Sequence, residues 1–201
     1  MKLTNFSANR LLSYSSFIAF LLFISCNHQT QQQAVAVEEE LDSIAEIEED
    51  PQQKKIDKLA SAWEYSEKND EMYGECRFAS IMSKNFVMQD IYGKTYANLT
   101  IRYTKLDGYD VFVLVSSGSL LCSRHDGTNY VMVKFDEDEP IKYVTTKPED
   151  RSSNMLFIEK SRDFIKRAQS AKKILIQVNL YKEGNPRFSF EPKESLKFDV
   201  K

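Results

Sequence analysis

Apolar and polar side chains alternate in short runs from residue 63 onward, and this period of two restricts the fold more than any other feature of the chain. Successive side chains of a strand point to opposite faces, so each run predicts a strand with one buried face. The run at 173–181 is the clearest, because Ile174, Ile176 and Val178 fall on one face. We expect strands at 75–83, 95–104, 110–116, 120–123, 130–135, 141–146, 155–158, 173–181 and 196–198, with further short strands at Trp63 and Tyr65 and at Phe188 and Phe190.

Turn and helix signals complete the fold prediction. Asp126-Gly127 predicts a hairpin, since a type I′ turn needs a positive φ at both central residues and glycine accepts it without steric cost. One helix is expected to begin at Ser161, a good N-cap. Its narrow apolar stripe consists of Phe164, Ile165, Ala168 and Ala171. About ten short strands and one helix in about 140 residues predict a mainly β domain, an antiparallel β-sandwich whose helix closes one edge or end.

The amino-terminal segment has the order of a secretory signal peptide. Lys2 and Arg10 precede an apolar run at 17–24, and Ser25 stands directly before Cys26. The apolar run has about eight residues, well short of the roughly twenty that a membrane-spanning helix requires. Its ending resembles the bacterial lipoprotein box, which implies removal of residues 1–25 and acylation of Cys26. The alternative is an ordinary signal peptide in which the cysteine has no special role.

Charge divides the rest of the chain into two parts. Residues 27–53 contain eight acidic side chains and no lysine or arginine, whereas residues 54–201 contain 25 basic and 22 acidic ones. The acidic part has too few apolar side chains to build a core. We therefore expect a flexible acidic tether at 26–55 and the β-sandwich domain at 56–201. The near balance of charge in the domain gives no reason to expect nucleic-acid binding.

The domain contains two cysteines, Cys76 and Cys122, and one histidine, His125. In an oxidising compartment an isolated pair of cysteines predicts a disulfide. Two buried free thiols are the open alternative, because cysteine also packs as a small apolar residue. So few ligands predict no metal site, and we expect no cofactor. His125 lies beside the predicted hairpin turn, where an exposed polar side chain is the usual occupant, so we do not expect an enzyme.

Tyrosines are frequent in and beside the predicted strands. An exposed tyrosine suits a protein or glycan contact, because its ring is apolar while its hydroxyl forms hydrogen bonds. The candidates for such a contact surface are Tyr92, Tyr96, Tyr109, Tyr130 and Tyr143.

Several short segments between residues 63 and 198 stand in a characteristic order. They are Trp63, residues 83–85, 99–103, 133–136, 156–158 and 171–173, Phe164, Phe190 and the ending at 196–198. Their order resembles a family of periplasmic β-sandwich proteins that includes the VasI-type accessory proteins of type VI secretion. The resemblance implies the fold and brings no catalytic residues with it. The lipoprotein box and the acidic tether depart from a simple soluble periplasmic protein.

These features predict a lipoprotein of the cell envelope. Asn27 stands where an aspartate tends to retain lipoproteins in the inner membrane, which implies an outer-membrane lipoprotein that faces the periplasm. Our first hypothesis is a non-enzymatic, lipid-anchored module that binds an envelope protein or assists an envelope assembly. The alternative is a lipoprotein that binds a glycan or another small ligand. A hydrolase is a third hypothesis and would need a nucleophile within hydrogen-bond reach of His125.

Overall fold

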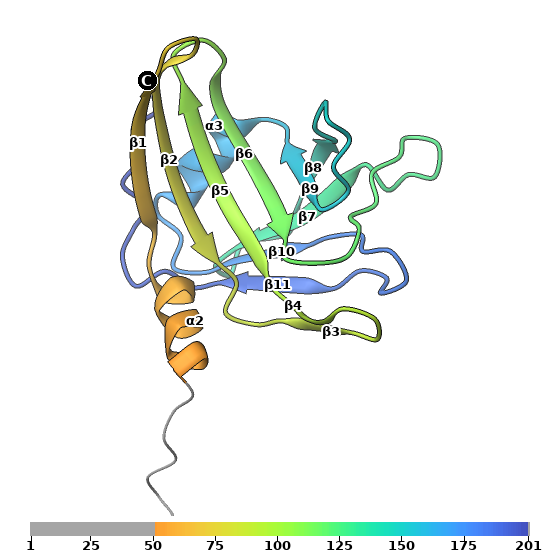
Figure 1. Cartoon of the computed structure of the whole chain (residues 1–201). Coiled ribbons are helices and arrows are strands. Elements are labelled where there is room, and N and C mark those ends of the chain that lie inside the picture. The colour runs from red at the N-terminus through yellow and green to blue at the C-terminus, as the bar shows by residue number, and fades with distance from the viewer. Residues whose placement is uncertain (1–50, 201) are drawn as a thin grey trace, which may run out of the picture. The chain divides into compact units, whose positions relative to one another are not determined.

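A curled antiparallel sheet of nine strands forms the body of the protein (Figure 1). The computed structural model describes residues 51–200, so the expected signal peptide, Cys26 and most of the expected tether lie outside the described residues. The described elements are, in chain order, α2 (Pro51–Ser61), β1 (Glu64–Asp70), β2 (Gly74–Met82), β3 (Val87–Gln89), β4 (Gly93–Thr95), β5 (Ala97–Thr104), β6 (Gly108–Val115), β7 (Tyr130–Phe135), β8 (Ile141–Thr146), β9 (Met155–Ile158), α3 (Ser161–Ala168), β10 (Ile174–Gln177) and β11 (Arg187–Phe190).

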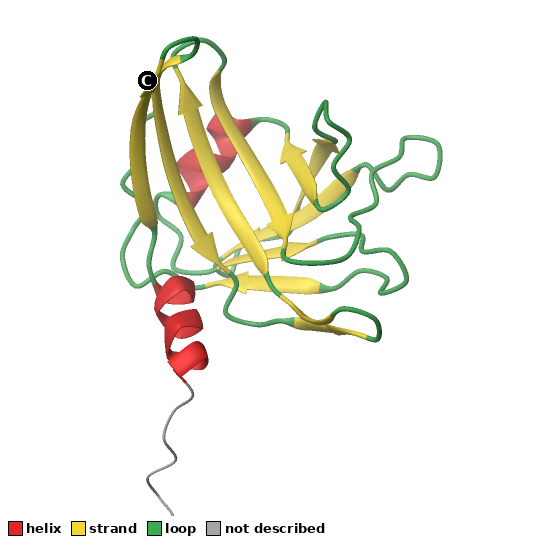
Figure 2. Ribbon diagram, viewed as in Figure 1, coloured by secondary structure: helices red, strands yellow, loops and turns green. Residues whose placement is uncertain are grey.

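The strands of the large sheet follow the order β1-β2-β5-β6-β9-β8-β7-β10-β11, and neighbouring strands are antiparallel. Strand β9 joins the two halves of this sheet. It pairs with β6 over four residues and with β8 over only two. The sheet curls at this junction, and the two halves enclose the apolar interior (Figure 2). Strands β3 and β4 form a separate two-stranded hairpin.

The segment after β2 crosses to the last strand of the sheet and covers its outer edge. The backbone N–H of Lys84 donates to the Ser189 carbonyl at 2.8 Å. The Asn85 side chain accepts a hydrogen bond from the Ser189 N–H at 2.7 Å and donates one to the Arg187 carbonyl at 2.8 Å. These bonds leave the backbone of β11 paired on both sides, which removes an edge open to aggregation.

The core lies inside the curl, where the alternating residues of both halves meet. Helix α3 packs into it, and the ring centroid of Phe164 lies 5.2 Å from that of Phe135 and 5.6 Å from that of Tyr143. Burial of this apolar surface is the main stabilising contribution to such a fold. Core side chains that are at most 1% exposed include Ala79, Ile81, Leu99, Ile101, Val111, Val113, Val131, Val133, Ile174, Ile176, Phe188 and Phe190.

The prediction of a mainly β domain is confirmed, and the strands β7, β8 and β9 have the expected bounds. The strand expected at 173–181 is too long, because β10 covers only Ile174–Gln177 although Val178 and Leu180 are buried. The strands expected at 120–123 and 196–198 are wrong. Leu120 forms only an isolated bridge with Leu180, and the terminal segment has no strand although Leu196 and Phe198 are buried. In both segments apolar and polar residues alternate because every second side chain packs into the core. An extended segment can do this without backbone hydrogen bonds to a neighbouring strand.

The helices differ from expectation in two respects. The sequence pattern does not predict α2, whose first five residues fall within the expected tether; Pro51 suits the first turn of a helix. Helix α3 begins at Ser161 as expected, but Lys160 in the left-handed conformation occupies the N-cap position. The Ser161 hydroxyl instead donates to the Ile158 carbonyl at 3.3 Å. The strand before the helix therefore provides the partner for this hydroxyl.

The hairpin predicted at Asp126-Gly127 is wrong, although the turn itself forms. Gly127 has a φ of 69°. The Asp126 carboxylate accepts hydrogen bonds from the hydroxyl and the backbone N–H of Thr128, at 2.7 Å and 3.3 Å. Such a side-chain turn closes a loop without needing paired strands on either side, and the residues before it contribute only a single bridge.

Candidate functional site

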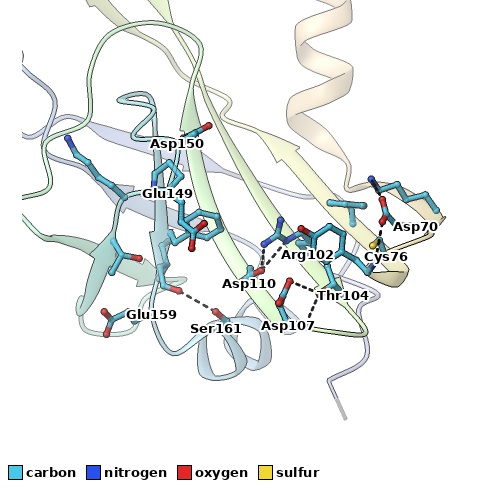
Figure 3. Close-up of a pocket in the computed structure, with 18 residues that line it drawn as sticks. Asp70, Cys76, Arg102, Thr104, Asp107, Asp110, Glu149, Asp150, Glu159 and Ser161 are labelled. Atoms are coloured by element: carbon cyan, nitrogen blue, oxygen red, sulfur yellow. Dashed lines mark hydrogen bonds and ion pairs between the residues drawn. The ribbon is translucent and has the colours of Figure 1, made fainter.

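An open groove of about 840 Å³ lies on the outer face of the sheet, where β1, β2, β5, β6 and β9 meet the loop at 147–150 (Figure 3). Alternation explains which side chains reach it. Ile101 and Val111 point into the core, so their neighbours Arg102 and Asp110 point outward. The groove is lined by Lys68, Asp70, Tyr73, Cys76, Phe78, Arg102, Thr104, Asp107, Asp110, Thr146, Lys147, Pro148, Glu149, Asp150, Phe157, Ile158, Glu159 and Ser161.

An ion pair occupies the floor of the groove. Arg102 and Asp110 face each other across β5 and β6, and the Arg102 Nε and Nη2 atoms both donate to Asp110 Oδ2, at 3.0 Å and 2.5 Å. The Arg102 guanidinium carbon lies 5.9 Å from the ring centroid of Phe157, whose own ring packs against Phe112 at 5.5 Å. The floor therefore combines a positioned charge pair with the ring of Phe157, and all three side chains remain partly accessible to solvent.

The rim of the groove is acidic. Six carboxylates and three cations line the groove as a whole. Hydrogen bonds from the backbone N–H groups of Tyr73 and Met72 lower the pKa of Asp70, and the Ser152 N–H lowers the pKa of Asp150. Asp70 is paired with Lys68 at 3.5 Å and Asp110 with Arg102. The excess negative charge that attracts cationic groups therefore comes mainly from Asp107, Glu149, Asp150 and Glu159. The charged lining residues are Asp70, Asp107, Asp110, Glu149, Asp150 and Glu159 against Lys68, Arg102 and Lys147.

The two cysteines of the domain are free thiols, so the disulfide alternative is wrong. Cys76 lies on the groove side of β2, and its Sγ atom is 3.5 Å from the Gly74 carbonyl. Cys122 follows β6 in the chain, and its Sγ atom is 3.4 Å from the Thr145 carbonyl. The two thiols therefore contact backbone carbonyls on different parts of the sheet. The alternative prediction of two buried free thiols is confirmed for Cys76, which is buried. Cys122 is also a free thiol but is only half-buried.

Tyr143 does not belong to a contact surface, which corrects one of the five tyrosine predictions. Its side chain is buried, and its hydroxyl donates to Asp163 Oδ2 at 2.6 Å. Burial and this hydrogen bond raise the pKa of Tyr143 above its ordinary value. The same bond lowers the pKa of Asp163. The buried ring of Tyr143 therefore reaches the partly exposed Asp163 and links β8 to α3 at the boundary of the core.

The other four tyrosines are at least partly accessible but do not come together. Tyr92 is exposed between β3 and β4, and Tyr96 is half-buried just before β5. Tyr109 lies on β6, where its hydroxyl donates to the Asp199 carbonyl at 3.0 Å, and Tyr130 begins β7. None of the four lines the groove. His125 is exposed and also lies outside the groove lining.

A second surface, which the sequence reasoning missed apart from Tyr92, lies on the β3–β4 hairpin. We define the hairpin surface as Phe86, Met88, Ile91 and Tyr92, whose exposed fractions range from 40% to 72%. These residues fall outside the alternating runs, in a stretch for which no strand is expected. The signal that marks them is the clustering of four large apolar side chains within seven residues that contain no regular period.

The described part of the chain contains no cluster of three histidine, cysteine or carboxylate side chains arranged to hold a metal ion. In residues 51–200, no helix is both long and apolar enough to span a membrane.

Comparison with known proteins leaves the family of the chain unassigned. No known protein family matches it, and no curated protein is similar to it in sequence. Among solved structures, the crystal structure of invasion associated protein B from Bartonella henselae matches with a TM-score of 0.38 and 13% identity, over 64% of this chain and 84% of that chain.

Proposed function

We propose that this protein is a non-enzymatic, lipid-anchored module of the bacterial outer membrane that faces the periplasm and holds a segment of an envelope protein in its groove. Acylation of Cys26 supplies the anchor, and the groove supplies the recognition surface. In this proposal the two halves of the curled sheet act as the layers of a β-sandwich. The role is accessory, in keeping with the resemblance to the VasI-type proteins.

The acidic groove is the observation that carries the proposal. Six carboxylates against three cations favour a partner segment rich in lysine or arginine, and such complementarity accelerates association. The paired Arg102 and Asp110 offer hydrogen-bonding groups on the floor, next to the ring of Phe157. A segment that binds here would have its basic side chains at the rim and an apolar or planar group over the aromatic floor.

A glycan or another small ligand is the second candidate, and the size of the groove favours it. Its volume of about 840 Å³ lies within the range of about 300–1,000 Å³ that is usual for small-molecule sites. Aromatic rings beside carboxylates and an arginine also suit a sugar, whose faces are apolar and whose edges carry hydroxyl groups.

The test is a crosslinking pull-down of the acylated protein from its native envelope. The rim variant carries Asp107→Asn, Glu149→Gln and Glu159→Gln. The matched control carries Glu137→Gln, Asp138→Asn and Glu139→Gln in the exposed turn after β7, so both variants lose three negative charges. We expect the wild-type and control proteins to recover the same partner. The rim variant should recover much less of it, with the difference shrinking at high salt because exposed charges are screened.

Equal recovery by the rim and control variants would remove the groove from the proposal. Recovery of no protein partner, together with retention of the wild-type protein on a glycan column, would replace the first candidate by the second.

A further inference from the structure

The hairpin surface lies at the end of the domain at which the chain enters. Helix α2 leads directly into β1, whose first residue, Glu64, pairs with Ser80 near the end of β2. The β3–β4 hairpin connects the end of β2 to the start of β5. Helix α2 and the hairpin therefore lie at the same end of the sheet, as Figure 1 shows. Asp70 and Asp107 of the groove belong to the turns at the opposite end of these strands.

The hairpin is held in a fixed position although its apolar side chains are exposed. Gln89 is buried beneath it, and its Nε2 atom donates to Thr95 Oγ1 at 2.6 Å and to the Ser117 carbonyl at 3.2 Å. The hydroxyl groups of Thr95 and Ser117 are 2.7 Å apart. These bonds fasten the hairpin to the loop after β6, so its outer face does not collapse onto the core. A fixed and exposed apolar surface is characteristic of an interaction site.

The described charged residues around the hairpin are net basic and suit an anionic surface, whereas the eight acidic side chains at 27–53 do not. The described side chains of α2 include the exposed Lys54, Lys55 and Lys58 beside Asp57, and the hairpin contributes Lys94 and Asp90. The Lys94 Nζ atom lies 4.9 Å from the ring centroid of Phe86. Large apolar side chains flanked by lysines are the pattern by which proteins bind in the interface of an anionic bilayer.

The expected anchor brings a bilayer close to this end of the domain. Twenty-four residues separate Cys26 from Pro51. A chain of that length, taken as a coil, has an average end-to-end distance of about 27 Å. The tether would then keep the hairpin at a high local concentration near the bilayer. A few apolar side chains would suffice for binding, because the contact is effectively intramolecular.

We propose that the hairpin surface docks on the lipid bilayer in which the chain is anchored, with Met88, Ile91 and Tyr92 in the interfacial region. Docking turns the groove away from the membrane and toward the periplasm. This inference rests on the lipid anchor of the proposed function, but it does not depend on what the groove binds.

The test uses the full acylated protein in vesicles of phosphatidylethanolamine and phosphatidylglycerol, with and without bromine on the lipid acyl chains. An indole is introduced by Tyr92→Trp, and the matched control is Leu106→Trp, which lies in the exposed turn between β5 and β6 at the far end of the domain. Trp63 is present in both variants and is buried, so it gives the same background.

We expect the emission of the indole at position 92 to shift to the blue and to be quenched by bromine, while the control at position 106 does neither. Adding Ile91→Asp to the Tyr92→Trp protein should lower the docked-to-undocked ratio by about tenfold, since one apolar side chain is lost from the interface. Equal emission of the two indoles in vesicles would overturn the inference. So would protection of position 92 that requires an added envelope protein, because the surface would then belong to a protein partner.

Mass spectrometry of the amino-terminal peptide separates the two possible failures. A peptide without acyl chains at Cys26 contradicts the anchor of the proposed function. An acylated protein whose position 92 is unquenched contradicts the docking alone.

Discussion

Glu191 holds the segment that follows β2 against the outer edge strand of the sheet, β11. Replacing its carboxylate tests how much this contact stabilises the fold. The Glu191 carboxylate accepts hydrogen bonds from the Lys84 Nζ atom at 2.7 Å and the Ser189 hydroxyl at 3.0 Å, and its Oε1 atom forms an ion pair with the Lys173 Nζ atom at 3.1 Å. Lys84 belongs to the segment that follows β2, whereas Lys173 precedes β10. One carboxylate thus joins three segments that are distant in the sequence.

The pKa of Glu191 sets the size of the effect. The hydrogen bond from Lys84, followed by that from Lys173, lowers this pKa from 4.5 to about 2. At about 1.36 kcal/mol per pKa unit, the upper bound is about 3.4 kcal/mol. Because 29% of the Glu191 side chain and 65% of that of Lys84 are exposed, solvent screening reduces the expected contribution to about 1 kcal/mol.

The sign of the pH dependence follows from the lowered pKa. The folded state binds the proton of Glu191 less readily than the unfolded state, so its contribution is fully present above about pH 4.5 and is lost as the pH falls toward about 2. Glu191→Gln should therefore lower the free energy of unfolding by about 1 kcal/mol at neutral pH, or about 2–4 °C in Tm. The difference between wild type and variant should shrink below about pH 3.

Urea unfolding of both proteins across this pH range measures the difference directly. The control is Glu194→Gln, which removes an ion pair with Lys197 in which about three quarters of each side chain is exposed, and it should leave stability unchanged. A variant at Glu191 that matches the wild type at neutral pH would refute the reasoning. A loss that stays constant down to low pH would also refute it, because charge would then not be its cause.

Three further predictions test the fold. Gly118→Ala should destabilise the protein by about 2 kcal/mol in urea unfolding, because φ is 87° and the added Cβ would lie 2.7 Å from the buried amide of Gln89, which would lose its hydrogen bonds to Thr95 and Ser117. Gly127→Ala, with a φ of 69° and open space, should cost only about 1 kcal/mol. Tyr143→Phe should lower the free energy of unfolding by about 1 kcal/mol in thermal unfolding, since it removes the hydrogen bond from a buried tyrosine to the partly exposed Asp163 of α3, and an unchanged Tm would contradict that role. Thiol titration of the unfolded domain without reductant should find both cysteines reactive, and reductant should leave its stability unchanged.

Local alternation located the buried face of most strands but not always their ends, since the run at 173–181 forms a strand only at Ile174–Gln177. Val131, Val133 and Phe135 of β7 alternate with half-buried residues, and the expected bounds are confirmed. Helix α2 has no comparable signal, because half of its described side chains are exposed and its sequence is largely polar. Lys160 was missed as the α3 N-cap because a left-handed lysine has no distinctive sequence pattern.

The groove could not be predicted from any local pattern. Arg102 and Asp110 are eight residues apart and meet only because the β5–β6 register places them opposite each other. Phe157 joins them through the pairing of β6 with β9, which are distant in the sequence. The tyrosine prediction failed at Tyr143 because alternation does not distinguish a buried hydroxyl with a partner from an exposed one.

Site-specific photocrosslinking in intact cells tests most directly whether the groove binds an envelope partner. A photoreactive residue replaces either Asp107, which is exposed and lines the groove, or Glu137, which is exposed in the turn after β7. We expect a covalent adduct with one envelope protein from position 107 and none with that protein from position 137. The same adducts from both positions, or none from position 107, would contradict a binding groove.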